Sequence, residues 1–387
     1  MSIFSQIWTV SVLNFKSLRM RFWQSMVIVA GLGVTIGVLL SMLSMTAGMK
    51  QAYFSAGSPD RAIVVSLGAN GEGNSSLPRA SAAVIMDAPG IARYKDGKPF
   101  ADAGLNTNVP VLRLNGGRTN AVLRGFGDKG IALRPEFRLV SGRMFEPGKR
   151  ELMVGVGAQT IYQHMQIGDK VIMPDGEWPI VGSFTTGDIL DGQLIGDAAT
   201  LMSATRHPNY NTVLIRLASR DSLATLSHAL TTNPALSVTV MRHSDWYKMV
   251  SDLNTGFLSM LAYVVGFVMA IGALFGCLNT MYAAVSARRR EIATLRALGY
   301  GAFPVAVSVV LEAMLLSAVG AMIGAAVAWA LYNGHQTVWG VNIFVLAVPP
   351  GLIGLGIAWA LMVALLGGLL PALGAARRPI AEALRAT

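Results

Sequence analysis

Long apolar runs without a charged residue alternate along the chain with one long stretch that carries most of its charge. A helix of about 20 apolar residues is long enough to cross the ~30 Å hydrocarbon core of a bilayer. The pattern predicts four membrane-spanning helices, at residues 22–49, 253–287, 303–331 and 350–374. A cleaved signal peptide is the alternative for the first run, but its apolar region would be shorter, about 7–15 residues.

Strand and helix patterns recur in the charged stretch 50–252, between the first and second predicted spans. Strands are expected at 61–67, 111–114, 120–124, 171–173, 178–184, 212–217 and 236–241, and helices at 79–86 and 221–230. Asp221 or Ser222 would cap the second helix, and the Gly-rich segment 68–76 is expected to be flexible. The predicted fold class is an α+β membrane protein, with four transmembrane helices and a large extracytoplasmic α+β domain between helices 1 and 2.

The charge composition changes this picture in two ways. Only 13% of the residues are charged, against about a quarter in soluble proteins, which argues against an ordinary soluble enzyme. The net charge of +10 lies mostly in short segments beside the predicted spans, at 16–21, 288–296 and 377–385. Because basic residues mark the cytoplasmic side of a membrane, both termini are expected inside and 50–252 outside. The positive charge then sets orientation, and no nucleic-acid partner is expected.

The segments outside the spans have separate predictions. Apolar residues at helical spacing, with lysine and arginine nearby, predict that 1–21 forms an amphipathic helix along the inner face of the membrane. A continuation of the first span is the alternative. Residues 332–349 are expected to form an outer loop, and 375–387 a cytoplasmic tail.

The sequence offers little catalytic chemistry. No P-loop is present, the five histidines lack metal-ligand spacing, and Cys277 is the one cysteine. We therefore expect a chain that is not an enzyme, with no catalytic residue, metal site or cofactor of its own. The pairs Gly33/Gly37 and Gly320/Gly324 lie inside predicted spans, where small residues four apart let helices pack closely.

Glu312 is an acidic residue inside the third predicted span. A carboxylate at membrane depth costs roughly 2.5–3.5 kcal/mol on insertion scales, so its side chain should face protein or water. Two interpretations stay open. Glu312 is either a coupling or gating residue, or a structural residue hydrogen-bonded between packed helices.

The segment 288–300, between the second and third spans, has the pattern of a short amphipathic helix. Ile292, Leu295 and Leu298 share one helix face, Glu291 and Arg296 lie elsewhere, and Gly299 is suited to a helix end. A helix of this kind can dock into the groove of a partner. The alternative is a charge cluster that only sets the topology.

Several motifs resemble those of a known family. The run Arg289–Gly299, the Leu311-Glu312-Ala313 triplet and Gly320–Gly324 closely resemble the FtsX-like permease domain of MacB-type (type VII) ABC transporters. The stretch 50–252 is similar to the periplasmic core domain of that family. Its motifs are Gly142–Phe145, Glu151–Gly155, Gly168-Asp169 and Trp178–Phe184. The resemblance extends over essentially the whole chain.

This resemblance implies a permease half that works as a homodimer in the inner membrane. It divides the outer domain into a porter-like part, 58–100 and 206–248, and a sabre-like part, 101–205. The segment 288–300 would be the coupling helix that contacts an ABC ATPase. The residues implied in this contact are Arg289, Arg290, Glu291, Ile292, Leu295, Arg296, Leu298 and Gly299.

The resemblance also implies partners and a function. The segment 1–21 is too short to hold an ATPase, so the ATPase is expected to be a separate chain that binds ATP and Mg²⁺. A membrane-fusion adaptor and an outer-membrane channel are further expected partners. ATP-driven motion of the outer domain would drive export, in a tripartite efflux or lipid- and lipoprotein-handling system. The alternative is an FtsX-like mechanotransmission or sensory regulator that controls a cell-wall hydrolase or a signalling partner without transport.

Overall fold

A computed structural model describes residues 3–17, 22–95, 97–340 and 342–377. The chain divides into two compact units. Residues Met1–Ala47, Gly256–His335 and Leu346–Thr387 form what we call the membrane unit. Residues Gly48–Thr255 and Gln336–Val345 form the outer unit. Most of the predicted cytoplasmic tail, 378–387, lies outside the described residues.

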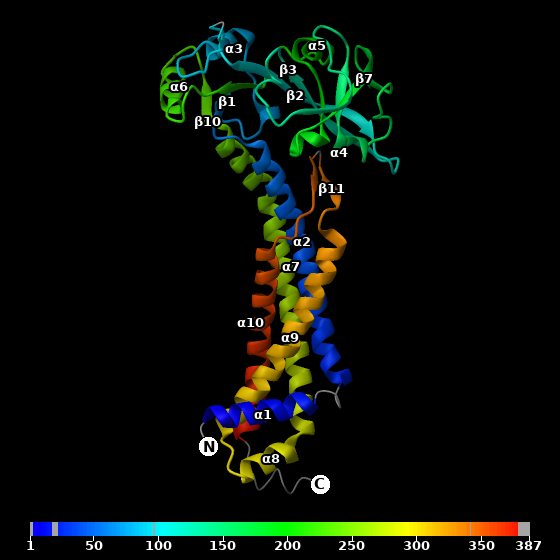
Figure 1. The fold of residues 1–387 in the computed structure, drawn as a ribbon, viewed down its shortest axis with the longest axis vertical. Helices are drawn as coiled ribbons and strands as arrows, with labels where there is room; N and C mark the ends of the chain where they lie inside the picture. Colours follow the sequence, from blue (N-terminus) through cyan, green and yellow to red (C-terminus); the bar gives the residue numbers. More distant parts are fainter. Residues whose placement is uncertain (1–2, 18–21, 96, 341, 378–387) are drawn as a thin grey trace. The chain divides into compact units, whose positions relative to one another are not determined.

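The membrane unit is helical (Figure 1). Its helices are α1 (Ile3–Ser17), α2 (Phe22–Ala56), α7 (His243–Ala287), α8 (Arg289–Ala297), α9 (Ala302–Tyr332) and α10 (Pro350–Arg377), of which α2 and α7 continue into the outer unit. Four of these, α2, α7, α9 and α10, are long and apolar enough to cross a membrane. The α2 and α7 helices run further than the predicted spans because no helix-breaking residue stops them at Met49 or Leu253.

Small residues allow the helices of the membrane unit to pack closely. Buried Leu32 and Ile36 of α2 share one apolar cluster with Ala321 of α9 and Ala360 of α10. The α1 helix lies across the ends of the long helices (Figure 1). Its Val10 is buried, whereas Phe4 and Trp8 are 84% and 73% exposed. An exposed aromatic edge of this kind agrees with the predicted amphipathic helix at a membrane surface.

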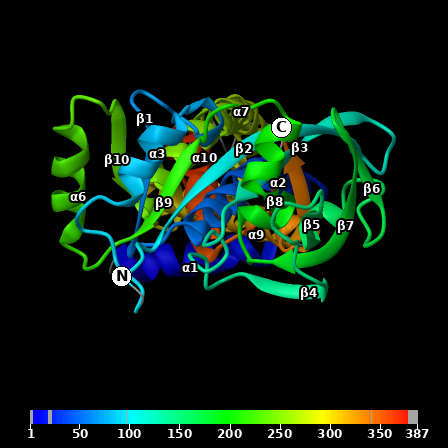
Figure 2. The ribbon, with the colours of Figure 1, turned by 90° about the horizontal axis from the view of Figure 1, so that it is seen from above.

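The outer unit is built on a ten-stranded sheet. Its strands are β1 (Arg61–Ser66), β2 (Ala101–Leu112), β3 (Arg118–Phe126), β4 (Arg138–Gly142), β5 (Leu152–Gly155), β6 (Lys170–Met173), β7 (Gly176–Thr185), β8 (Leu194–Asp197), β9 (Thr212–Arg216) and β10 (Val238–Arg242). The order is β10-β1-β9-β2-β3-β8-β5-β7-β4, with β6 paired to β7 (Figure 2). The α+β fold class, with a sheet-rich domain between the first and second membrane helices, is confirmed.

Short helices cover this sheet. They are α3 (Arg79–Met86), α4 (Val156–Gln159), α5 (Ala198–Ala204) and α6 (Ser222–Thr231), with the 3₁₀ turns η2 (Glu72–Asn74) and η3 (Ile189–Gly192). Asp221 is the N-cap of α6, but its side chain makes no capping hydrogen bond. The Gly-rich segment predicted to be flexible is tied down instead, because Ser66 N–H donates to Ser75 Oγ at 2.8 Å and Glu72 is buried.

Two hydrophobic cores lie along the sheet. One packs α3 and α6 against β1 and β9, and includes Val64, Ile85 and Leu226. The other surrounds Trp178 and Leu152. The β2 strand pairs with β9 on one side and β3 on the other, so a single sheet runs through both parts. The first ten residues of β2 were not predicted as a strand, because they include polar Asn and Thr residues. Pairing with the two neighbouring strands is what makes this segment a strand.

The predicted outer loop 332–349 contains a β-hairpin, β11 (Gln336–Trp339) and β12 (Asn342–Val345). Ile343 is 4% exposed and belongs to the second core of the outer unit. Thr160 Oγ1 donates a 2.6 Å hydrogen bond to Gln336 Oε1. The hairpin is therefore part of the outer unit and fills a place in its core.

Candidate functional site

The α8 helix is a separate short helix between α7 and α9, with the sequence that resembles a coupling helix. It begins after Arg288, whose φ and ψ of −99° and 12° break the continuity with α7. At the other end Gly299 has φ +94°, a backbone conformation that favours glycine. Its N–H donates to the Arg296 carbonyl at 3.1 Å. Gly299 therefore ends α8 as the sequence pattern indicates.

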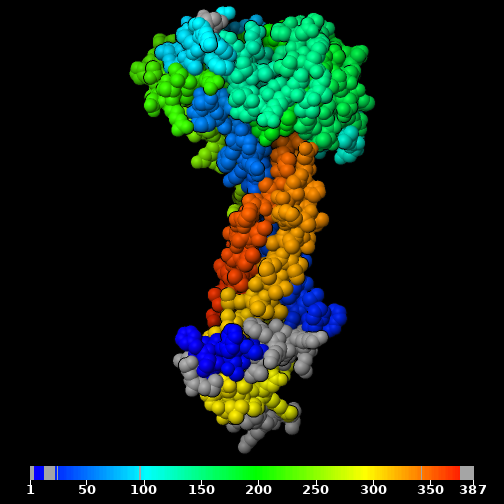
Figure 3. Space-filling model, viewed as in Figure 1, coloured from blue at the N-terminus to red at the C-terminus, as the bar shows by residue number. Residues whose placement is uncertain are grey.

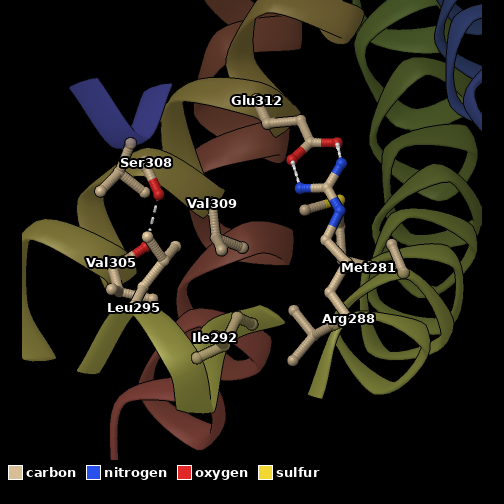
Figure 4. A pocket seen from close by; sticks show the side chains of 11 residues that line it. Met281, Arg288, Ile292, Leu295, Val305, Ser308, Val309 and Glu312 are labelled. Atoms are coloured by element: carbon tan, nitrogen blue, oxygen red, sulfur yellow. Dashed lines mark hydrogen bonds and ion pairs between the residues drawn. The ribbon is translucent and has the colours of Figure 1, made fainter. Parts of the chain in front are cut away.

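Glu312 is paired with Arg288 (Figure 4). Arg288 Nη1 donates to Glu312 Oε2 at 2.8 Å, and Nη2 donates to Oε1 at 3.1 Å. Each side chain is only 5% exposed. A two-bond fork of this kind fixes both the position and the orientation of the two groups. The interpretation of Glu312 as a residue bonded between packed helices agrees with this geometry.

Sequence reasoning missed Arg288 as the partner, because it counted this residue only within a charge cluster. The available signal was physical. A lone carboxylate in an apolar helix requires a counter-charge. An arginine cluster lies shortly before α9 in the sequence, at the start of α8. The 24-residue separation gives no periodicity that would select Arg288 over Arg289 or Arg290.

The ion pair is enclosed by apolar side chains from four helices (Figure 4). The lining includes Val10 of α1, Met281 of α7, Ile292 and Leu295 of α8 and Val309 of α9. The space-filling view shows α1 in blue beside α8 in yellow (Figure 3). Charge-assisted bonds are stronger where water is excluded, so this pair can hold α8 firmly to α9.

Two residues of the predicted contact face also pack within the chain. Ile292 and Leu295 are half-buried and line the cavity around the ion pair of their own chain. Ala293 is 3% exposed. The outward surface of α8 instead carries Arg289, Arg290 and Glu291, and Leu298 is 72% exposed. The surface available to a partner is therefore mainly charged.

The four predicted packing glycines meet where α2 crosses α9. A Cβ added at Gly33 would lie 3.1 Å from the Gly320 carbonyl oxygen, and one at Gly37 would lie 3.6 Å from that of Gly324. A Cβ at Gly320 would lie 2.5 Å from the Val29 carbonyl oxygen. Real Cβ atoms do not approach as closely as 2.5 Å, so the backbones touch at Gly320 only because this residue is glycine.

Two of the outer-domain motifs also meet. Arg143 donates to both carboxylate oxygens of Glu151, at 2.8 and 2.6 Å. Gly142 has φ +75°, and a Cβ there would collide with the backbone of Val181 and Gly182. The Arg143 side chain holds the pKa of Glu151 below its ordinary value, against the opposing effect of desolvation. These motifs build a tight turn at the edge of the sheet.

Comparison with protein families decides the assignment of the chain. The family model described as MacB-like periplasmic core domain matches residues 25–233, and that described as FtsX-like permease C-terminal matches residues 263–380. The chain belongs to the MacB- and FtsX-like permeases. The resemblance seen in the sequence is thereby confirmed. Permeases of this family are components of ABC-type systems, and the four apolar helices make this permease a multi-pass membrane protein.

Solved structures match the outer domain of the permease at low identity. The extracellular domain of the noncanonical ABC-type transporter YknZ from Gram-positive bacteria is 14% identical, with a TM-score of 0.36, over 47% of this chain and 99% of that chain. The periplasmic region of MacB from Actinobacillus actinomycetemcomitans is 14% identical, with a TM-score of 0.38, over 50% and 92%. A search of the curated proteins finds no match.

Proposed function

We propose that this permease is the membrane subunit of a homodimeric ABC exporter, and that α8 receives the motion of a separate ATPase that binds ATP and Mg²⁺. The observation that carries the proposal is the buried Arg288–Glu312 fork at the start of α8. A helix that is to transmit force must not rotate freely where it joins the membrane helices. The fork prevents such rotation, because both guanidinium donors are fixed on one carboxylate of α9.

The charged outward face of α8 is proposed to contact the ATPase. Arg289, Arg290 and Glu291 carry both signs of charge, which favours a specific orientation on a complementary surface. A push on α8 would reach α9 through Glu312 and α7 through Arg288. The proposal places both termini in the cytoplasm and the outer unit on the far side of the inner membrane. A membrane-fusion adaptor and an outer-membrane channel would complete an exporter.

The test is copurification of the full-length permease with its ATPase from the native host. Reversal of an outward charge, Glu291→Lys, should weaken ATPase binding about tenfold or more, since it removes the negative charge from the proposed contact face. Glu177→Lys, which changes an exposed glutamate of the outer unit, is the matched control and should retain the ATPase. Full retention of the ATPase by Glu291→Lys would contradict the assignment of α8.

The proteins that copurify also decide what the complex does. An adaptor that remains bound, together with ATP-dependent transport in reconstituted vesicles, supports export. A cell-wall hydrolase or a signalling protein in place of an adaptor, with no transport, would replace export by the regulatory function. Leu295→Asp is unsuitable for this experiment, because Leu295 lines the cavity around the ion pair of its own chain.

A further inference from the structure

A second buried ion pair lies in the outer unit, between Glu72 of η2 and Arg124 of β3. Each side chain is 7% exposed. Arg124 Nη1 donates to Glu72 Oε2, and Arg124 Nε donates to Gln193 Oε1 at 3.0 Å. Asn106 Nδ2 donates to the same Glu72 oxygen at 3.4 Å. The carboxylate therefore has several partners in a site closed to water.

The pair joins the two cores of the sheet. Glu72 follows β1, which belongs to the core around Val64 and Ile85. Arg124 lies on β3 beside Leu123, which belongs to the core around Trp178. The ion pair therefore spans the porter-like and sabre-like parts.

The chain passes between the two units four times, after residues 47, 255, 335 and 345. These passages belong to α2, to α7 and to the two ends of the β11–β12 hairpin. Every force that the membrane unit transmits along the chain to the outer unit must pass through these three connections.

Each of the three connections places a side chain in the cluster around Glu72. Tyr247 of α7 is 4% exposed, and its Oη donates to Glu72 Oε1 at 3.5 Å. The ring of Tyr53, from α2, lies 6.1 Å from the ring of Tyr247. Asn342 of the hairpin lies near Tyr53. We call Glu72, Arg124, Tyr247, Tyr53 and Asn342 the junction cluster.

The ends of α2 and α7 are held against each other at the same place. A Cβ added at Gly57 would lie 2.9 Å from the Ser244 Cα, so the two backbones are in direct contact. The Ser58 N–H donates to His243 Nδ1 at 3.3 Å. The two helix ends are therefore in direct contact and joined by a hydrogen bond.

Charge stabilises the junction cluster. Burial alone would raise the pKa of Glu72, but the Arg124 guanidinium outweighs it and holds that pKa below its ordinary value. Partial burial and the nearby charge of Arg124 lower the pKa of Arg134 to about 10, so a second guanidinium stays protonated there at neutral pH. An ionised carboxylate in this position strongly resists separation from its partners.

We propose that Glu72 and Arg124 are positioning residues, which hold both parts of the outer sheet in register with α2, α7 and the hairpin. A displacement of these connections is thereby delivered to both parts at once. The inference rests on the proposed function for the source of the displacement. It goes beyond that function by naming the place in the outer unit where the displacement is received.

The first test needs no ATPase. Hydrogen exchange is compared between the wild-type full chain in lipid nanodiscs and the double variant Glu72→Gln/Arg124→Gln, which removes both charges and keeps similar volumes. Exchange should rise about fivefold or more in 68–76, 189–193 and the hairpin, and stay unchanged in α9 and α10. Lys170→Gln/Glu177→Gln, an exposed pair of the same unit, is the matched control. Equal exchange in wild type and the junction variant would overturn the inference.

The second test asks for transmission, which a purely structural role would not affect. A spin label is attached at Ala224→Cys or, in a separate sample, at Ser203→Cys, exposed positions on α6 and α5, in a Cys277→Ala background. For each position, the distance between the labels of the two protomers is measured with and without a non-hydrolysable ATP analogue in the ATPase complex. The analogue should shift both distances in wild type and in the control. The shifts should be lost in the junction variant, although its ATPase binding and hydrolysis persist.

The outcomes separate the two proposals. A junction variant that keeps the nucleotide-dependent shift would overturn the role of Glu72 and Arg124 while leaving the exporter assignment intact. A wild-type complex whose outer domain never responds to nucleotide would overturn both the proposed motion and its delivery at this cluster. Arg124→Lys keeps the charge but loses the planar guanidinium that bonds both Glu72 and Gln193, and should restore part of the shift.

Discussion

The membrane unit and the outer unit both contain a buried arginine–glutamate pair, but they satisfy it in different ways. Arg288 and Glu312 are enclosed mainly by apolar side chains. Glu72 and Arg124 lie among other polar groups, with Gln193, Asn106 and Tyr247 as hydrogen-bond partners. The comparison teaches that similar pairs can differ in what surrounds them. The first pair lies mainly among apolar side chains, whereas the second joins several elements through its polar neighbours.

The largest expected effect is in the membrane unit. Glu312→Leu should lower the free energy of unfolding by about 3–5 kcal/mol, because it leaves the Arg288 charge buried without its carboxylate. The double variant Arg288→Met/Glu312→Leu should recover most of that loss, because it removes both charges. Unfolding of the nanodisc-embedded permease, followed as a double-mutant cycle, measures the coupling. A double variant no more stable than Glu312→Leu alone would mean that the unpaired Arg288 charge is not the cause of the loss.

A smaller effect is expected from the corresponding change in the outer unit. Arg124→Gln should cost about 1–3 kcal/mol, because Asn106 and Tyr247 still bond Glu72 and the Arg134 charge remains nearby. Thermal unfolding of the outer unit in the full chain, followed by hydrogen exchange, measures this cost. If Arg124→Gln costs more than Glu312→Leu, the network does not protect its pair.

Lowering the pH should weaken the stabilisation that the Glu72–Arg124 pair provides. The pKa of Glu72 in the folded chain lies below the ordinary value of 4.5, so its ionised form stabilises the fold above that pH. This stabilisation is lost as the pH falls through the lowered pKa. The stability difference between wild type and Glu72→Gln should therefore be constant from pH 7 to about pH 5.5 and shrink below about pH 4.5. A stability difference that grows as the pH falls would mean that the pKa of Glu72 is raised rather than lowered.

The smallest effect is expected for a pair that is not buried. Lys170 and Glu177 are 58% and 59% exposed. Water already solvates both charges, so Lys170→Gln should change the free energy of unfolding by less than about 1 kcal/mol. The same unfolding measurement checks this value. A loss as large as that of Arg124→Gln would mean that burial is not what separates the three pairs.

Hydropathy was sufficient for the membrane helices, because about 20 apolar residues in a row have few alternatives to spanning a bilayer. The helix 79–86 was predicted with the bounds that α3 has, since its pattern is local. The polar part of β2 was missed because it is a strand only through β9 and β3, which are distant in sequence. The hairpin in 332–349 was missed for the same reason, because Ile343 is buried only against the outer sheet.

The candidate site, too, was predicted from the sequence only in part. The composition of 288–300 and the lone charge of Glu312 already marked both as costly features that need a partner. The pairing of Glu312 with Arg288, the inward position of Ile292 and Leu295, and the junction cluster followed only from the folded chain. Periodicity along the chain reports which face of an element is apolar or charged. What covers that face depends on contacts between residues far apart in sequence, and only the packed structure selects them.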